Sequence, residues 1–285
     1  MKTYMGYFLI LACLFSGCIN NAASRREKEI TVVSREEGSG TRGAFIELFG
    51  VEESGTDGKK KDMTTKEAVI AKQTDVMMTN IATDPYAIGY ISLGSLNDTV
   101  KALQIGDTDA TADNVKNGSY PISRPFNIAT KGTPDGLCED FIRFILSKEG
   151  QEVVAKSYIA VYDNAPAFVS EKQSGKIVIA GSTSVAPVME KLKEAYLLLN
   201  TNAAIEIQQS DSSAGMTSVM DGTCDIGMSS RALKESEAAQ LTATKIAIDG
   251  IAVIVNKENT VMNLEKEDIK HIFTGQLTTW SAFVK

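Results

Sequence analysis

Four times along this chain of 285 residues, a short apolar segment runs directly into a turn rich in glycine, serine and threonine. The four segments, at residues 29–33, 177–180, 204–208 and 225–230, have the length and composition of strands. A helical pattern opens directly after three of the turns. Strands that alternate with helices favour an α/β fold with mainly parallel sheets. The turns are therefore expected at the carboxyl ends of strands.

The rest of the chain continues this alternation. Further strands are expected at residues 87–93 and 251–256, and residues 77–83 are apolar as well. Helical spacing marks residues 43–49, 137–146, 150–158, 216–220 and a segment that ends at residue 199. A charged helix is expected after residue 230, and the polar segment 51–63 predicts an exposed loop.

The turns carry groups that suit a small oxyanion. Helix N-termini present unpaired N–H groups and a partial positive charge, and glycines let the backbone approach a ligand closely. Arg35, beside the first turn, adds a planar guanidinium that can bind phosphate or carboxylate with two hydrogen bonds. Any one of these hydroxyls is better explained as an ordinary N-cap, but four turns together with an arginine indicate a shared anion site.

Several classes of function are disfavoured. A net charge of −7 argues against nucleic acid as a partner. No turn has the spacing of a nucleotide-binding P-loop, and no cysteine or histidine spacing predicts a metal site or another cofactor. The single histidine, His271, lies in a polar helical segment where a surface role is expected. The serines of the turns have no obvious partner base, so an enzyme is disfavoured.

The N-terminus predicts export. Residues 1–17 contain an early lysine, an apolar segment and small residues, which is typical of a secretory signal peptide. Because the ending "LFSGC" resembles a bacterial lipobox, we expect cleavage before Cys18, acylation of its thiol and a polar tether at 18–28; a plain signal peptide cut a few residues later is the alternative. Cys138 and Cys224 then remain, either as a disulfide or as two free thiols.

The chain contains an ordered set of motifs: "VVSREEGSGTRGAF", "AIGYISLG", "YPISRPF", "FILSKEGQ", "GSTSVAP", "DSSAG", "DGTCDIGMSSR", "DGIAVIVN" and "IFTGQLTTW". Together these motifs resemble those of the phosphate-binding proteins of ABC-type phosphate importers. The resemblance covers residues 29–280 and implies a two-lobe, type II periplasmic-binding-protein-like α/β fold with the ligand in the cleft between the lobes. It also implies a surface lipoprotein that binds inorganic phosphate and delivers it to the membrane permease of an ABC importer.

The order of the motifs differs from that in the family. There "GSTSVAP" opens the mature protein and "IFTG…W" leads into "SREEGSGTR", whereas here the second half comes first. This order predicts a circular permutation with the old termini joined around residues 168–176; a fragment of a longer or tandem chain is the alternative. One lobe, lobe I, is expected at 120–254, and lobe II from 29–119 together with 255–285.

The family's ligand positions carry over to both lobes. The resemblance implies that phosphate is bound by Thr183, Ser184, Ser212 and Ser230 of lobe I and by Arg35, Ser39, Gly40 and Thr41 of lobe II. Ser230 departs from the family, where an aspartate accepts the proton of phosphate and repels sulfate. Asp211, Glu37 and Asp225 are nearby substitutes, although Glu37 is expected to orient Arg35 and Asp225 to brace its turn. The alternatives to a phosphate carrier are a binding protein or sensor for another oxyanion and, less favoured, a secreted phosphate-ester hydrolase.

Overall fold

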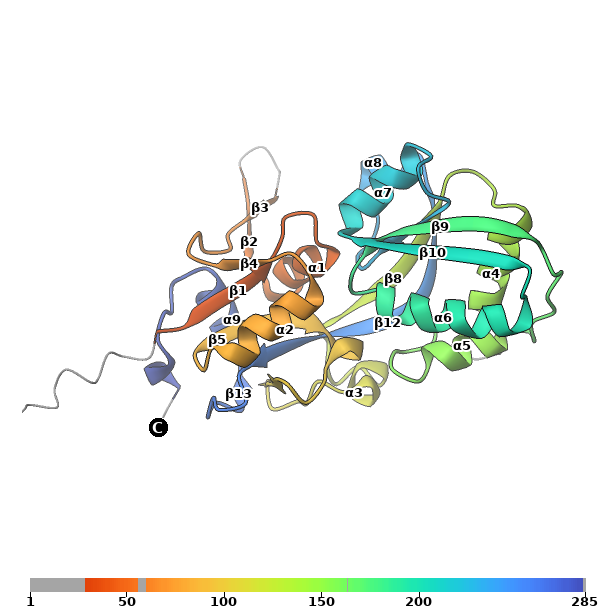
Figure 1. Ribbon diagram of the computed structural model, residues 1–285. Coiled ribbons are helices and arrows are strands. Elements are labelled where there is room, and N and C mark those ends of the chain that lie inside the picture. Colours follow the sequence, from red (N-terminus) through yellow and green to blue (C-terminus); the bar gives the residue numbers. More distant parts are fainter. Residues whose placement is uncertain (1–28, 56–59, 163, 284–285) are drawn as a thin grey trace, which may run out of the picture.

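The computed structural model describes residues 29–55, 60–162 and 164–283 (Figure 1). The predicted signal peptide, Cys18 and tether therefore lie outside the described residues. The described strands are β1 (Thr31–Arg35), β2 (Glu52–Ser54), β3 (Lys60–Asp62), β4 (Val69–Ala71), β5 (Ala87–Ser92), β6 (Lys101–Ala102), β7 (Gln104–Ile105), β8 (Ser123–Thr130), β9 (Gly175–Ser182), β10 (Ala203–Ser210), β11 (Ile226–Ser229), β12 (Thr242–Val255) and β13 (Asn263–Leu264). The described α-helices are α1 (Gly40–Phe49), α2 (Thr74–Thr83), α3 (Ala112–Lys116), α4 (Gly136–Leu146), α5 (Lys148–Val154), α6 (Ala186–Leu199), α7 (Ser212–Met220), α8 (Glu235–Ala238) and α9 (Lys266–Phe273); η2 (Leu93–Ser95) and η3 (Trp280–Ala282) are 3-10 helices.

One sheet runs through both lobes, in the order β10-β9-β11-β8-β12-β5-β1-β4, with β6 beside β12. The outer pairs are parallel, as the alternation of strands and helices predicts. The two middle strands, β8 and β12, are antiparallel to each other and to their outer neighbours β11 and β5. Figure 1 shows these two strands passing from one lobe into the other, so they form the connection between the lobes.

Each lobe has its own core. The hydrophobic cluster of lobe II lies around β1, β5, α1, α2 and α9, and that of lobe I around β8, β9, α4 and α6. Along β12 the side chains change from the lobe I cluster at Ala247 to the lobe II cluster at Ile251. Tyr120, Ile122 and residues 251–254 thus pack with lobe II, a few residues inside the segment expected for lobe I.

The first and last described segments meet in lobe II. Glu29 forms an isolated bridge with Thr279, and the backbone N–H of Ile30 donates to the carbonyl of Thr278 at 2.7 Å. Trp280, only 2% exposed, belongs to the same core as Phe45. Lobe II is therefore completed by both ends of the described chain, which lie side by side in Figure 1.

Several elements differ from the sequence prediction. Strand β8 was not expected, and β12 is much longer than the predicted strand at 251–256. The predicted loop at 51–63 instead contains the antiparallel pair β2 and β3. Helix α1 begins at Gly40, three residues before the predicted helix, and the apolar segment at 77–83 is the greater part of α2.

Candidate functional site

Arg35 is the last residue of β1, and its side chain is buried between the lobes. Nε and Nη2 donate to the two carboxylate oxygens of Glu36 at 2.8 and 2.7 Å. Nη2 also donates to Thr183 Oγ1 of lobe I at 3.0 Å, and Nη1 to Thr74 Oγ1 at 3.4 Å. With 2% exposure, this guanidinium is held by a bidentate partner in its own lobe and faces hydroxyls of both lobes.

The first turn of α1 follows directly. Ser39 is the N-cap, and its Oγ accepts from the N–H of Arg42 at 3.3 Å, so the ordinary capping role exists alongside any role in binding. Thr41 is fully buried, and its Oγ1 lies 2.7 Å from Ser184 Oγ of lobe I, so the two lobes are in direct contact here. The N-terminus of α1 therefore points its donors at lobe I.

Three turns of lobe I meet this loop. Thr183 and Ser184 lie between β9 and α6, Ser212 is the first residue of α7, and Ser230 follows β11. Ser212 Oγ accepts from the N–H of Ser230 at 3.1 Å. The hydroxyls of Ser212, Ser230 and Ser182 are linked by contacts of 3.4 and 3.0 Å, which makes a continuous row of hydroxyl groups.

The backbone of lobe II approaches this row very closely. A Cβ atom on Gly40 would lie 2.4 Å from Ser212 Oγ and 2.7 Å from Ser230 Oγ. The carbonyl of Gly38 accepts from the N–H of Ser213 at 3.3 Å. The eight residues predicted as ligands are all buried in this one region, three turns from lobe I against one loop from lobe II.

The acidic residues near the site have other partners. Glu36, and not the predicted Glu37, orients Arg35; Glu37 is exposed. Asp211 is the N-cap of α7 and accepts from the N–H of Ala214 at 2.8 Å. Asp225 accepts from the N–H of Val178 at 2.7 Å and so ties β9 to the start of β11.

Three residues of this region were not identified from the sequence. Ser182 contacts Ser230, Thr74 contacts both Arg35 and Thr183, and Tyr90 Oη accepts from the N–H of Arg35 at 3.1 Å. Burial raises the pKa of Tyr90 and keeps its hydroxyl neutral. Ser182 lies in the "GSTS" turn and was within reach of sequence reasoning. Thr74 and Tyr90 are brought here by tertiary contacts alone.

Other residues of chemical interest lie elsewhere. Cys138 and Cys224 are free thiols, and burial raises their pKa to about 12 and about 11. His271 is 42% exposed on α9, at 3.3 Å from Glu267.

Among the described residues, no group of His, Cys, Asp or Glu side chains is arranged to hold a metal ion. No helix in the described ranges has the length and apolar character needed to cross a membrane.

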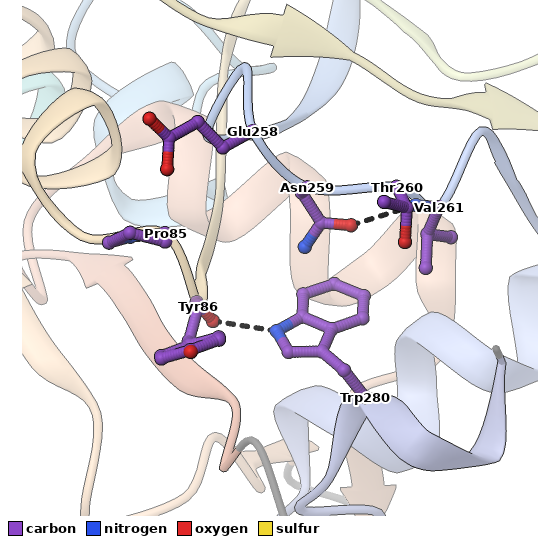
Figure 2. A pocket seen from close by; sticks show the side chains of 7 residues that line it. All are labelled: Pro85, Tyr86, Glu258, Asn259, Thr260, Val261 and Trp280. Atoms are coloured by element: carbon purple, nitrogen blue, oxygen red, sulfur yellow. Dashed lines mark hydrogen bonds between the residues drawn. The ribbon is translucent and has the colours of Figure 1, made fainter.

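A pocket of about 180 Å³ in lobe II lies apart from this site (Figure 2). Trp280 forms one wall and donates through Nε1 to the carbonyl of Tyr86 at 2.8 Å, while the loop from Glu258 to Val261 forms the other. Tyr86 precedes the amino end of β5, whereas Arg35 lies at the carboxyl end of the neighbouring parallel strand β1. The pocket therefore opens at the opposite edge of the sheet.

Comparisons with known proteins agree with this architecture. A family model described as a PBP superfamily domain matches residues 11–149 and 167–284. Phosphate-binding protein PstS 2 of Streptococcus agalactiae serotype V is 53% identical over 274 residues, covering 95% of this chain and 94% of the relative. Phosphate-binding protein PstS of Bacillus subtilis is 33% identical over 113 residues, covering 39% of this chain and 38% of its own length.

A solved structure also matches this chain over most of its length. The crystal structure of a phosphate ABC transporter, phosphate-binding protein from Streptococcus pneumoniae TIGR4, is 45% identical, covers 90% of this chain and 100% of that chain, and has a TM-score of 0.71. Family model, curated relative and structure each cover most of the chain. The chain therefore belongs to the PBP superfamily and, within it, to the PstS family of phosphate-binding proteins.

Proposed function

We propose that this protein binds inorganic phosphate between its lobes and delivers it to the membrane permease of an ABC importer, without a chemical step. The observation that carries the proposal is the burial, in one region, of eight residues from both lobes that match the family's ligand loops. The relatives named phosphate-binding proteins support the ligand. The similarity to the pneumococcal structure, which is that of a phosphate ABC transporter protein, supports the partner.

The site has the chemistry that a phosphate ion requires. The ion would receive charge-assisted hydrogen bonds from Arg35, which are worth about 1.5–3 kcal/mol each, and further bonds from hydroxyls and from the N-termini of α1 and α7. Because the ligands come from both lobes, the ion stabilises the arrangement in which the lobes are in contact.

Selection against sulfate is assigned to the same site. At Ser230 a hydroxyl replaces the aspartate of the family. This hydroxyl can accept a hydrogen bond from protonated phosphate, but a weaker one than a carboxylate would accept. Glu36 is bound to Arg35, and Asp211 caps α7. We therefore expect phosphate to be preferred by a smaller margin than a carboxylate in that position would give.

Titration calorimetry with phosphate, sulfate and molybdate tests the ligand. Binding of phosphate in preference to the other two is expected, and preferential binding of sulfate or molybdate would favour the alternative of a carrier or sensor for another oxyanion. Uptake of labelled phosphate by cells that lack the gene, restored by the parent and not by Arg35→Ala, tests the transport role. If the parent protein bound phosphate but did not restore uptake, the result would instead favour a sensor.

The location is part of the same proposal. We infer export and acylation at Cys18, which would hold the protein on the outer side of the cell membrane through a lipid anchor. The resemblance of "LFSGC" to a lipobox supports this inference. Replacement of Cys18 by Ser should release the protein into the medium, and retention on the membrane would contradict the anchor.

We also propose that the chain is a circular permutation of the family order. Two observations support it. The Bacillus relative aligns over only 39% of this chain, as expected when two blocks are exchanged, whereas the streptococcal relative aligns over 95%. Residues 29–30 also lie beside Thr278 and Thr279, where a covalent link would restore the family order. A variant linked there and opened within residues 168–176 should fold and bind phosphate; failure to fold would argue against it.

A further inference from the structure

The two lobes also touch at a second place, next to the strands that connect them. Tyr158, which follows α5 in lobe I, packs against Gly94 in η2 of lobe II. A Cβ atom on Gly94 would lie 2.2 Å from Cε1 and 2.4 Å from Cζ of this ring, whereas real Cβ contacts below 3.0 Å essentially never occur. The φ angle of Gly94 lies outside the left-handed region, so the ring alone excludes a side chain there.

The ring of Tyr158 has little freedom to move. Its side chain is 4% exposed and packs on Phe126 of β8, with ring centroids 5.4 Å apart. The next residue, Ile159, pairs with Ile248 of β12 through two backbone hydrogen bonds of 2.9 and 3.0 Å. Tyr158 is therefore fixed to both connecting strands.

Gly94 is fixed to the same place. Asp249 Oδ1 accepts from the N–H of Gly94 at 3.3 Å and from Ser92 Oγ at 3.0 Å. The other oxygen, Oδ2, accepts from Arg124 of β8 at 3.2 Å, and Arg124 and Asp249 are both buried. Adjacent residues of β12, Ile248 and Asp249, thus hold the two sides of the contact.

We propose that the contact between Tyr158 and Gly94 is the pivot against which the lobes close, and that Tyr158 and Gly94 are positioning residues for phosphate binding. The inference rests on the proposed function, because it assigns a role in the same closure. A side chain at residue 94 would force the ring and η2 apart beside the connecting strands, and the loops of the two lobes would then fail to meet around the ion.

The test uses five variants of the mature protein. Gly94→Ala introduces the obstruction. Gly43→Ala is the matched control, because this glycine also faces the other lobe but a Cβ there would lie 3.7 Å from Arg231 Cδ, an ordinary contact. Tyr158→Phe keeps the ring and removes a buried hydroxyl that lies near Ser92 and Ser95 but forms no hydrogen bond of ordinary geometry among the described residues. Tyr158→Ala, alone and combined with Gly94→Ala, removes the ring.

Phosphate affinity by calorimetry should fall at least tenfold in Gly94→Ala and stay within twofold of the parent in Gly43→Ala and Tyr158→Phe. In the Tyr158→Ala background, the added Gly94→Ala should cost less than twofold, because the obstruction is gone. An unchanged affinity in Gly94→Ala, or the same tenfold loss in both backgrounds, would overturn the proposal.

Solution scattering separates this inference from the proposed function. If the parent protein bound no phosphate, the proposed function would be refuted. The pivot would then be tested by scattering in the absence of ligand. Gly94→Ala should then have a larger radius of gyration than Gly43→Ala, and the Tyr158→Ala background should abolish the difference. Equal radii in the two glycine variants would refute the pivot.

Discussion

Replacement of Arg35 by alanine should abolish most of the phosphate affinity. In the site this guanidinium contacts Thr183 and Thr74, from opposite lobes, so an ion between the lobes lies within reach of Nη1 and Nη2. Two charge-assisted hydrogen bonds at about 1.5–3 kcal/mol each amount to about 3–6 kcal/mol. At 1.4 kcal/mol for each tenfold change, Kd should rise by a factor of about 10² to 10⁴.

The neighbour of Arg35 adds a second effect. Glu36 is 16% exposed and is bound to the guanidinium by both carboxylate oxygens, so the alanine variant leaves a half-buried negative charge beside the anion. Removal of this charge in the double variant Arg35→Ala, Glu36→Ala should therefore recover part of the lost affinity. The affinity that the double variant recovers measures the repulsion between Glu36 and phosphate. The loss that remains measures the missing hydrogen bonds from Arg35.

Calorimetry at pH 7 and constant ionic strength measures these affinities, and urea unfolding verifies that each variant is folded. Arg42→Ala is the control: Arg42 lies in the first turn of α1, and its side chain donates to Asp62 and to the carbonyl of Arg35, both at 2.7 Å, instead of facing the hydroxyls of lobe I. It should change Kd by no more than a few-fold. If Arg35→Ala bound phosphate within threefold of the parent, the site would be wrongly assigned.

The remaining predictions test the closure, the core and the buried charges. Gly40→Ala should lower the affinity at least tenfold in calorimetry with an unchanged urea midpoint, because its Cβ would lie 2.4 Å from Ser212 Oγ; unchanged affinity would contradict the close approach of the lobes. Phe45→Ala should lower the free energy of unfolding by about 3–5 kcal/mol in urea, because this fully buried ring stacks on Tyr90 at 3.9 Å; a loss below about 1 kcal/mol would contradict the packing. Burial raises the pKa of Asp249 to about 6 despite Arg124, whereas an unfolded aspartate titrates near 4. The folded state therefore binds the extra proton between these values, and this contribution to stability is lost as pH rises from about 4 to about 6. In urea titrations across that range the stability difference between the parent and Asp249→Asn should shift in favour of the variant; a constant difference would contradict the raised pKa.

The turns that meet between the lobes were predictable because each one is formed by residues that are contiguous in the sequence. A strand, a turn of small hydroxyl residues and a helix N-terminus are contiguous in the sequence, so the positions of Ser39, Ser212 and their neighbours follow from the chain itself. Which carboxylate orients Arg35 was not predictable in this way. Glu36 and Glu37 are adjacent, and only the direction of the chain after β1 selects Glu36.

The connecting strand β8 was missed because Pro125 lies within it and proline disfavours a central strand. The structure explains why proline is tolerated. Its partner across the ladder, Ile248, uses its N–H and carbonyl for Ile159, so the pair makes no ladder hydrogen bonds. On the other side β11 pairs only with residues 127–129. The missing N–H of Pro125 therefore interrupts no hydrogen bond between strands. This tolerance depends on Ile159 and β11, which are distant from β8 in the sequence.

The hairpin of β2 and β3 was missed for a different reason. Its residues are polar and lack the alternation that marks a half-buried strand. Glu53 faces Lys61 across the pair, and Lys60 forms an ion pair of 2.6 Å with Glu52. Asp62, which faces Glu52, is held by Arg42, and this contact attaches the pair of strands to the first turn of α1.

The meeting of the two ends of the described chain in lobe II has a consequence for the order of folding. Lobe I is encoded almost continuously, so its core can form as soon as β12 is available. Lobe II cannot form then, because β5 needs the last part of β12 as its partner and the core also needs Trp280. The first segment of lobe II must therefore wait with apolar surface exposed, although it precedes lobe I in the sequence. Lobe I is thus expected to fold before lobe II on whichever side of the membrane the chain folds.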